Sequence, residues 1–176
     1  MDERSWRDFK ITSIAEAIAA ARYNSTGIAM TELGCYEIGD QRVDILLVSM
    51  RPLVGVPLHL HRCGGESQLA LTPIRGVFGR PLRGRDGQYQ YTEAGRVRFE
   101  VQLNRILTPN EVVSIPAGFV HGYGNPSETQ DAHVIFNLPH THTTAADRLL
   151  ADCEMQLLKQ TPPIEDYEQY AAQLSR

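Results

Sequence analysis

The sequence predicts an all-β fold, in which many short strands close a barrel or sandwich with short helices at both ends of the chain. Short apolar or alternating runs recur between residues 27 and 138, and turn-forming residues separate them. The run 97–107 begins with apolar residues at odd positions and polar residues between them, which is the period of a half-buried strand. The pair Asp86-Gly87 is a typical hairpin signal. Many short strands favour a barrel or sandwich over a βαβ fold.

The first element expected is a helix over residues 13–22. Ser13 and Glu16 have the spacing of a capping box, in which each side chain satisfies a backbone amide of the first turn. Ile14, Ile18 and Ala21 follow at helical spacing. We expect residues 1–29 to form a helical extension packed on the outside of the barrel.

The barrel domain is expected over residues 30–139, with its first strand beginning slightly earlier. The expected strands are 27–30, 35–38, 43–50, 57–61, 66–72, 77–79, 89–91, 97–107, 112–115 and 132–138. Past Pro139 the apolar residues return to helical spacing, and residues 140–176 are expected to form helices. The first begins near Thr144 with an apolar stripe that includes Leu149 and Leu150, and a second follows the pair Pro162-Pro163.

Composition and charge exclude several classes of protein. A chain of 176 residues with 42% hydrophobic residues suits one globular domain, and a net charge of -4 disfavours nucleic-acid binding. No apolar run approaches the ~20 residues that span a bilayer. The N-terminal residues lack the apolar core of a signal peptide, and three scattered cysteines do not form a disulfide framework. We therefore expect a cytoplasmic protein without a membrane partner.

Two short segments about sixty residues apart carry the residues with chemical potential. The first contains His59, His61 and Glu66. Residues i and i+2 of a strand face the same side, so the two histidines can converge, and the pair Gly64-Gly65 permits a tight turn that returns Glu66 beside them. The second segment supplies His121. Three imidazoles and one carboxylate suit a divalent first-row metal such as Fe, Mn, Ni, Cu or Zn.

The spacing of these residues resembles the two motifs of the cupin superfamily. The first reads His-x-His-x4-Glu, and the second reads Pro-x-Gly-x2-His-x3-Asn from Pro116 to Asn125. The resemblance covers about residues 30–139. It implies a single antiparallel cupin barrel, a double-stranded β-helix or jelly roll, with His59, His61, Glu66 and His121 as ligands of one metal ion. The sequence departs from the family at three glycine positions. Leu53 and Asn110 stand where glycine is expected, and the glycine expected seven residues after Glu66 comes later, at Gly76. Asn110 can still adopt left-handed geometry.

Four further residues are candidates for contact with a substrate. Gln68 shares the strand parity of Glu66 and could touch the metal or substrate, or hold a ligand in place. Tyr123 shares the parity of His121 and is either a proton donor or a packing residue. Arg80 belongs to an arginine-rich region that could bind a carboxylate or phosphate at the barrel mouth, or else form a solvated hairpin face. His133 could line the pocket.

The resemblance implies a metal-dependent enzyme acting on a small polar organic molecule, and a homodimer. One divalent transition metal is expected, with iron preferred. Iron would make the protein a dioxygenase, which is an oxidoreductase. Glu66 would serve as a metal ligand or as a base. Mn, Ni or Zn would instead suit isomerase or lyase chemistry on a sugar phosphate or carboxylate. The remaining alternative is a barrel that binds a small ligand without catalysis, because fold alone does not select a function.

Overall fold

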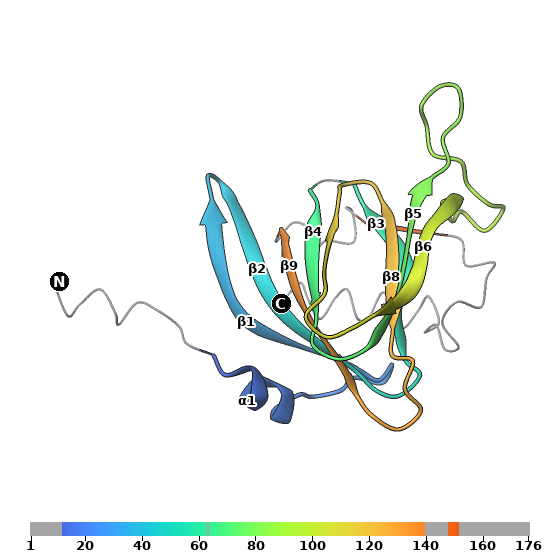
Figure 1. Cartoon of the computed structure of the whole chain (residues 1–176). Helices are drawn as coiled ribbons and strands as arrows, with labels where there is room; N and C mark the ends of the chain where they lie inside the picture. Colours follow the sequence, from blue (N-terminus) through green and yellow to red (C-terminus); the bar gives the residue numbers. More distant parts are fainter. Residues whose placement is uncertain (1–11, 63, 140–147, 152–176) are drawn as a thin grey trace.

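The computed structural model describes residues 12–62, 64–139 and 148–151 (Figure 1). Within these ranges the chain forms one short helix, α1 (Ile14–Ala19), and a series of antiparallel strands. The strands are β1 (Ile28–Ile38), β2 (Gln41–Met50), β3 (Gly55–His61), β4 (Glu66–Ala70), β5 (Ile74–Pro81), β6 (Phe99–Leu107), β7 (Val112–Ile115), β8 (Val120–Gly124), β9 (Ala132–Pro139) and β10 (Arg148–Leu150). The all-β prediction is confirmed.

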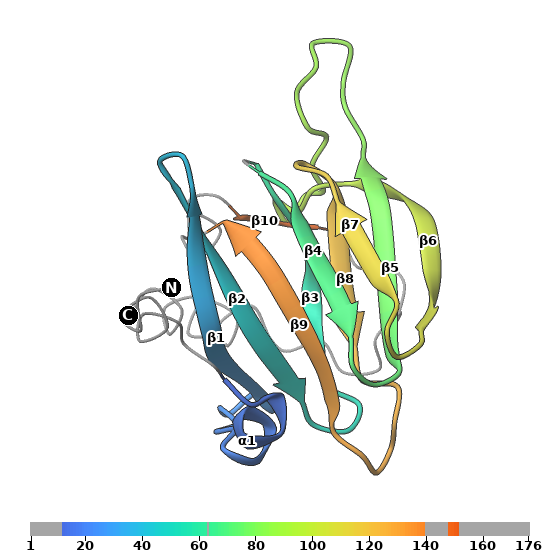
Figure 2. The ribbon, with the colours of Figure 1, turned by 60° about the vertical axis from the view of Figure 1, so that its left-hand side comes forward.

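The strands form two facing sheets. The first has the order β1-β2-β9-β4-β7, and the second has the order β10-β3-β8-β5-β6. Figure 2 shows the first sheet in front of the second, so that the two enclose a common interior. Sequence neighbours such as β4 and β5 lie in different sheets, which is the crossing pattern of a jelly roll.

Apolar side chains pack on both sides of the second sheet. The larger cluster fills the space between the sheets and includes Val56, Phe78 and Phe136. The smaller cluster contains Leu58, Leu60, Val77, Val97, Val120 and Ala151. Val97 and the adjoining Tyr89 belong to the arginine-rich segment between β5 and β6, so this segment covers the outer face of the second sheet.

A helix is present within the range 13–22 that the sequence predicted. Helix α1 is shorter than the expected 13–22, and Ser13 caps it by accepting a hydrogen bond from the backbone amide of Glu16 at 3.3 Å. The helix lies against β1 and β2. The two strands expected at 27–30 and 35–38 are one strand, β1, which continues through a register shift between Glu32 and Gly34.

The prediction of a helix beginning near Thr144 is wrong for residues 148–150, the part of it that forms a described element. Residues 148–150 form β10, which pairs with β3 in the register Leu149 to Leu60 and Leu150 to His59. Without β10, strand β3 would have a neighbour, β8, on one side only, and the backbone groups of its other edge would need partners. Pairing with this edge outweighs the helical spacing of the apolar residues. The other residues of the expected C-terminal helices lie outside the described ranges.

Turns at the barrel ends adopt the geometry that the family glycines would allow. Leu53 has φ of 60° and Asn110 has φ of 71°. Both stand where the resemblance expected glycine, and the left-handed prediction for Asn110 is confirmed. Gly64 and Gly118, beside the two motifs, have φ of 74° and 76°. Among the described residues, no helix has the length and apolar character needed to cross a bilayer.

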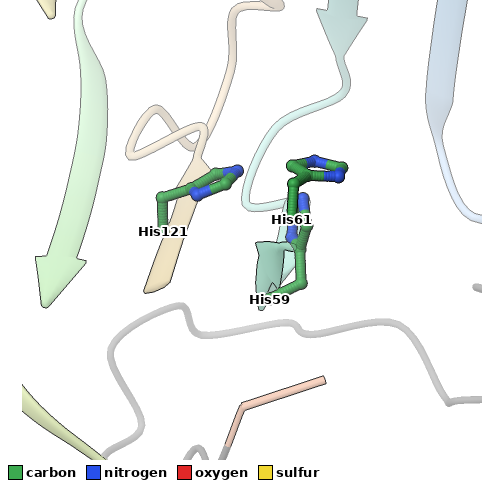
Figure 3. Close-up of side chains that lie close together, drawn as sticks. All are labelled: His59, His61 and His121. Atoms are coloured by element: carbon green, nitrogen blue, oxygen red, sulfur yellow. The ribbon is translucent and has the colours of Figure 1, made fainter. Parts of the chain in front are cut away.

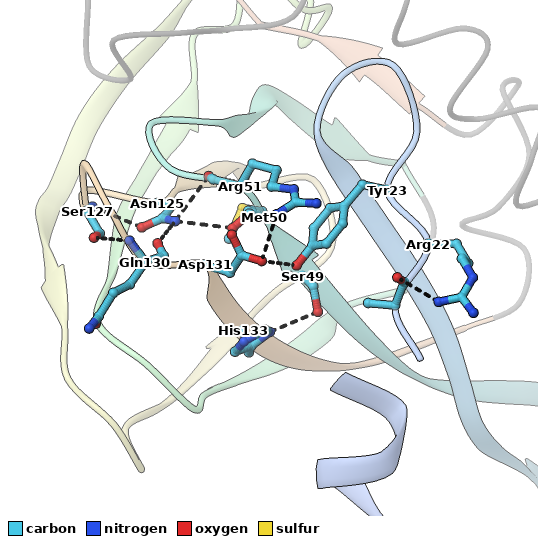
Figure 4. A network of polar contacts seen from close by, with 11 residues as sticks. Arg22, Tyr23, Ser49, Met50, Arg51, Asn125, Ser127, Gln130, Asp131 and His133 are labelled. Atoms are coloured by element: carbon cyan, nitrogen blue, oxygen red, sulfur yellow. Dashed lines mark hydrogen bonds and ion pairs between the residues drawn. The ribbon is translucent and has the colours of Figure 1, made fainter. Parts of the chain in front are cut away.

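A polar network ties the loop after α1 to the ends of β2 and β9 (Figure 4). The hydroxyl of Tyr23 donates to Asp131 at 2.5 Å, and the guanidinium of Arg51 lies over the Tyr23 ring at 4.0 Å from its centre. Ser49 and His133 are hydrogen-bonded at 2.9 Å beside them. Burial, followed by the bond to Asp131 and its negative charge, raises the pKa of Tyr23 to about 12.

Replacing Tyr23 by phenylalanine is expected to remove a pH-dependent part of the stability. A pKa raised above its unfolded value means that the folded state holds the proton more tightly, so the contribution is complete below pH ~10 and is lost as pH approaches 12. Urea midpoints between pH 8 and 11.5 should show wild type above Tyr23→Phe at pH 8 and the two converging at high pH. If the urea midpoints of wild type and Tyr23→Phe differed by the same amount at every pH, the Tyr23 hydroxyl would not contribute pH-dependent stability.

Candidate metal centre

The three motif histidines meet inside the barrel on adjacent strands of one sheet. His59 and His61 lie on β3 and His121 lies on β8, where His59 and His121 are cross-strand partners. Figure 3 shows the three rings turned toward one another. Each residue is at most 4% exposed, and one ligand atom from each lies within 4.8 Å of the others. The described residues therefore contain a buried cluster that could hold a metal ion.

A bulge in β3 aims His59 into the interior. Val56 pairs with Tyr123 and His59 pairs with His121, so β3 advances by three positions where β8 advances by two. In a regular strand Val56 and His59 would face opposite sides, whereas here both face inward. Pro57 lies within this bulge, which is one of the few places where a strand accepts proline. The bulge also turns the carbonyl of Pro57 toward the His59 ring, at 2.7 Å from Nδ1.

Two backbone carbonyls determine which ring nitrogen faces the centre. Nδ1 of His59 donates to the carbonyl of Pro57, and Nδ1 of His121 donates to the carbonyl of Phe119 at 3.0 Å. In a neutral imidazole the other nitrogen, Nε2, then carries the lone pair. This arrangement is common in metal-binding histidines, because the second hydrogen bond holds the ring orientation. Sequence reasoning missed both carbonyls, although each belongs to the residue two positions before its histidine.

Glu66 enters the same centre from the opposite sheet. It begins β4, is 8% exposed, and its Oε1 lies 3.3 Å from Nε2 of His121, while Oε2 lies 3.7 Å from Nε2 of His61. Gln68, which is 1% exposed, donates from Nε2 to Oε1 of Glu66 at 2.6 Å. The carboxylate is therefore held in place at the edge of the histidine cluster by a neighbour on its own strand.

The contact between Glu66 and His121 is attractive only if a cation lies between the two atoms. Nε2 of His121 is buried without a hydrogen-bond partner among the described residues, and it faces an oxygen that also carries lone pairs. A second proton on the imidazole or a metal ion would make the contact favourable. The donor set, three nitrogens and one carboxylate, fits a first-row divalent metal.

The three ligand atoms would have to move closer together to bind one ion. Three nitrogens bound at ~2.1 Å from the same metal lie about 3.0–3.6 Å from one another. The observed limit of 4.8 Å exceeds this range by about 1–2 Å, which rotations of the three side chains would supply. The residues present therefore fit the metal that the resemblance implies.

Tyr123 and Arg80, two further predicted site residues, lie outside the group of four candidate ligands. Tyr123 is 5% exposed and faces the interior, where its ring packs against Phe136 at 4.8 Å between centres. Arg80 is exposed on β5, two residues after Phe78, whose cross-strand partner is His121. Its guanidinium carbon lies 5.8 Å from the centre of the Phe119 ring, so it stands at the end of the barrel nearest the cluster.

His133 does not join the cluster. The alternate residues of β9, such as Val134 and Phe136, pack in the interior, so His133 faces the outside of the first sheet. There its Nδ1 bonds to Ser49, and burial lowers the pKa of the imidazole. The pocket-lining position expected for His133 is thus not the one that it occupies.

Gly65 controls the approach of the two motif segments. A Cβ atom at this position would lie 2.6 Å from the carbonyl oxygen of Ile115, which belongs to the strand leading into the second motif. Replacing Gly65 by alanine is expected to push Glu66 away from the histidines, lower the unfolding free energy by about 1–3 kcal/mol and weaken metal binding. Gly34→Ala is the matched control, because nothing lies within 4 Å of its Cβ position.

Urea denaturation and metal stoichiometry together test this effect. The Gly34 variant should match wild type in both measurements. A Gly65 variant with wild-type stability and metal content would show that the turn relaxes without cost.

Comparisons with known proteins support the architecture. The protein TT1209 from Thermus thermophilus is 18% identical, with a TM-score of 0.50 over 74% of this chain and 98% of that chain. CapF, solved with the inhibitor 3-isopropenyl-tropolone, is 17% identical, with a TM-score of 0.51 over 75% of this chain and 33% of that chain. A cupin-2 domain containing protein from Shewanella frigidimarina is 12% identical, with a TM-score of 0.47 over 74% of this chain and 95% of that chain.

No protein-family model matches the chain, and no curated protein matches its sequence. The structural likenesses are all below 25% identity and therefore bear on the fold alone. The TM-scores of 0.50 and 0.51 for TT1209 and CapF support the arrangement of two facing antiparallel sheets. The likenesses to TT1209 and CapF show that this chain shares the fold of those two structures.

Proposed function

We propose that this protein is a metal-dependent enzyme that acts on a small polar organic molecule. The observation that carries the proposal is the buried approach of Oε1 of Glu66 to the unpartnered Nε2 of His121, at 3.3 Å. Two electron-rich atoms at this distance in a buried site need a proton or a metal ion between them, and the neighbouring imidazoles favour a metal ion. His59 and His61 complete the donor set, and we propose all four side chains as ligands of one ion.

The residues around the ion have distinct proposed tasks. His59 and His121 are held in their binding tautomer by the Pro57 and Phe119 carbonyls. Glu66 neutralises part of the charge and is the only carboxylate in contact with the cluster among the described residues, so it is also the candidate base. Tyr123 presents a phenol on the inward face as a candidate proton donor. Arg80, exposed at the near end of the barrel, would hold an anionic group of the substrate.

We propose iron as the metal and a dioxygenase reaction as the activity. Histidine and carboxylate donors with coordination positions left open are typical of non-haem Fe(II) oxygenases. When bound, the metal would polarise a substrate oxygen and, as iron, bring O2 to the substrate. The side chains supply the rest: they orient the substrate, exclude water through their burial and offer Glu66 as a proton acceptor.

Elemental analysis of freshly purified protein tests the metal, and oxygen consumption tests the reaction. We expect one iron per chain and oxygen uptake with a catechol, diketone or enol panel. Stoichiometric Mn, Ni or Zn without oxygen uptake would favour the isomerase or lyase alternative. Absence of any stoichiometric metal, before and after reconstitution, would overturn the enzyme proposal in favour of a non-catalytic binding barrel.

A further inference from the structure

Gln68 presents a second polar atom that the metal centre does not use. Its Nε2 donates to Oε1 of Glu66 at 2.6 Å, but its own Oε1 is buried with no hydrogen-bond partner among the described residues. The residue is 1% exposed and lies on the inward face of β4. A buried acceptor without a donor is costly, so such groups in native proteins usually meet a ligand or an ordered water.

The orientation of this amide is settled by its neighbour. If the amide were turned over, its oxygen would lie 2.6 Å from the carboxylate oxygen of Glu66, and two acceptors at that distance repel. The unpartnered atom is therefore the oxygen, which can only accept a hydrogen bond. The cross-strand neighbours of Gln68, Phe136 and Val113, have apolar side chains and offer no donor.

We propose that Gln68 selects the substrate by accepting a hydrogen bond from a hydroxyl group next to the metal-binding atoms. This inference rests on the proposed function, because it places the hydroxyl on a molecule bound beside Glu66. The amide of Gln68 then has two roles. Its Nε2 positions the carboxylate of Glu66, and its Oε1 accepts a hydrogen bond from the substrate hydroxyl. The chemical class is a small molecule with an alcohol or enol hydroxyl beside a second oxygen, such as a 2-hydroxy acid, an enediol or a catechol. Methyl ethers of the same molecules would be rejected.

The test compares two probes that differ in their ability to donate. Glycolate and methoxyacetate offer similar oxygen atoms to a metal, but only glycolate carries a hydroxyl proton. Protein loaded with Co(II) would be titrated with each probe, and binding would be followed by the visible absorption of the metal. We expect wild type to bind glycolate at least about tenfold more tightly than methoxyacetate.

The variant Gln68→Met removes the acceptor while keeping a side chain of similar length. We expect its preference for glycolate to fall to within about twofold of methoxyacetate when both are measured at saturating Co(II), because loss of the bond to Glu66 should also weaken metal binding. Ser67→Ala is the matched control, since Ser67 is the adjacent residue of β4 and faces the other side of the sheet. This control should keep the wild-type preference.

The outcomes separate this inference from the proposed function. If the Co(II)-loaded wild type bound both probes with equal affinity, or bound neither, the proposed role of Gln68 would be overturned and its oxygen would be assigned to water. The metal centre would stand in that case. A preference that survives in Gln68→Met would also overturn it. Failure of wild type to bind Co(II) would remove both proposals. Equal affinity of wild type for the two probes would overturn the role of Gln68 even if the variant does not fold.

Discussion

Replacing His121 by alanine is expected to abolish stoichiometric metal binding. The residue is 2% exposed, and its Nε2 lies 3.3 Å from Glu66 on the opposite sheet, so it connects the two halves of the centre. Removing a ligand should reduce metal affinity by more than the ~10–100-fold that loss of a supporting residue costs. Elemental analysis after dialysis should find about one metal per chain in wild type and none in the variant. Added metal should raise the melting temperature of wild type only.

His133→Ala is the control for this prediction. It removes a histidine of the same chain that faces away from the interior and bonds to Ser49. Its metal content should equal that of wild type, although its stability can change. If His121→Ala retained a full complement of tightly bound metal, the ion would be held elsewhere and the proposed centre would be wrong.

Replacing Asn125, by alanine or by aspartate, is expected to cause the largest loss of stability among the variants considered. Asn125 is 4% exposed, and its Nδ2 donates to the carbonyls of Met50, Arg51 and Gln130 at 3.1, 3.0 and 2.7 Å (Figure 4). Its Oδ1 accepts from the amide of Ser127 at 2.9 Å. One side chain therefore joins the end of β2 to the loop between β8 and β9. Alanine would remove these hydrogen bonds from a buried position, at a cost of about 2–4 kcal/mol.

Urea denaturation should show this loss as a lower midpoint with an unchanged slope. Asn125→Asp is the informative companion, because it keeps the acceptor for Ser127 but replaces the donor with a second oxygen that faces three carbonyls. We expect it to be at least as destabilised as alanine. An aspartate variant close to wild type would mean that the donor contacts contribute little.

The candidate ligands could be identified from the sequence because their positions depend on local spacing. His59 and His61 are two positions apart on one strand, Glu66 follows a glycine turn, and His121 stands at a family spacing from Pro116. Strand alternation then places such residues on one face without knowledge of the rest of the fold. Asn110 was predictable for a related reason, since left-handed geometry is a property of the residue itself.

Other features depended on partners that the sequence does not reveal. The strand at 148–150 pairs with the edge of β3 that faces away from β8. The spacing of Leu149 and Leu150 alone suits a helix as well as a strand. The facing of His133 follows from the register of β9, and a shift of one residue would reverse it. The arginine-rich segment covers the outside of the second sheet through Val97 and Tyr89, which composition did not indicate.

The sequence by itself determined the fold class, the two motifs and the identity of the four candidate ligands, because strand period and turn chemistry are properties of neighbouring residues. Only the tertiary structure decided that Pro57 lies in a bulge, that two carbonyls orient the imidazoles, and that Glu66 meets them from the opposite sheet. Those arrangements arise from pairing between strands distant in the chain, and the lowest free energy of that pairing cannot be obtained from any single segment.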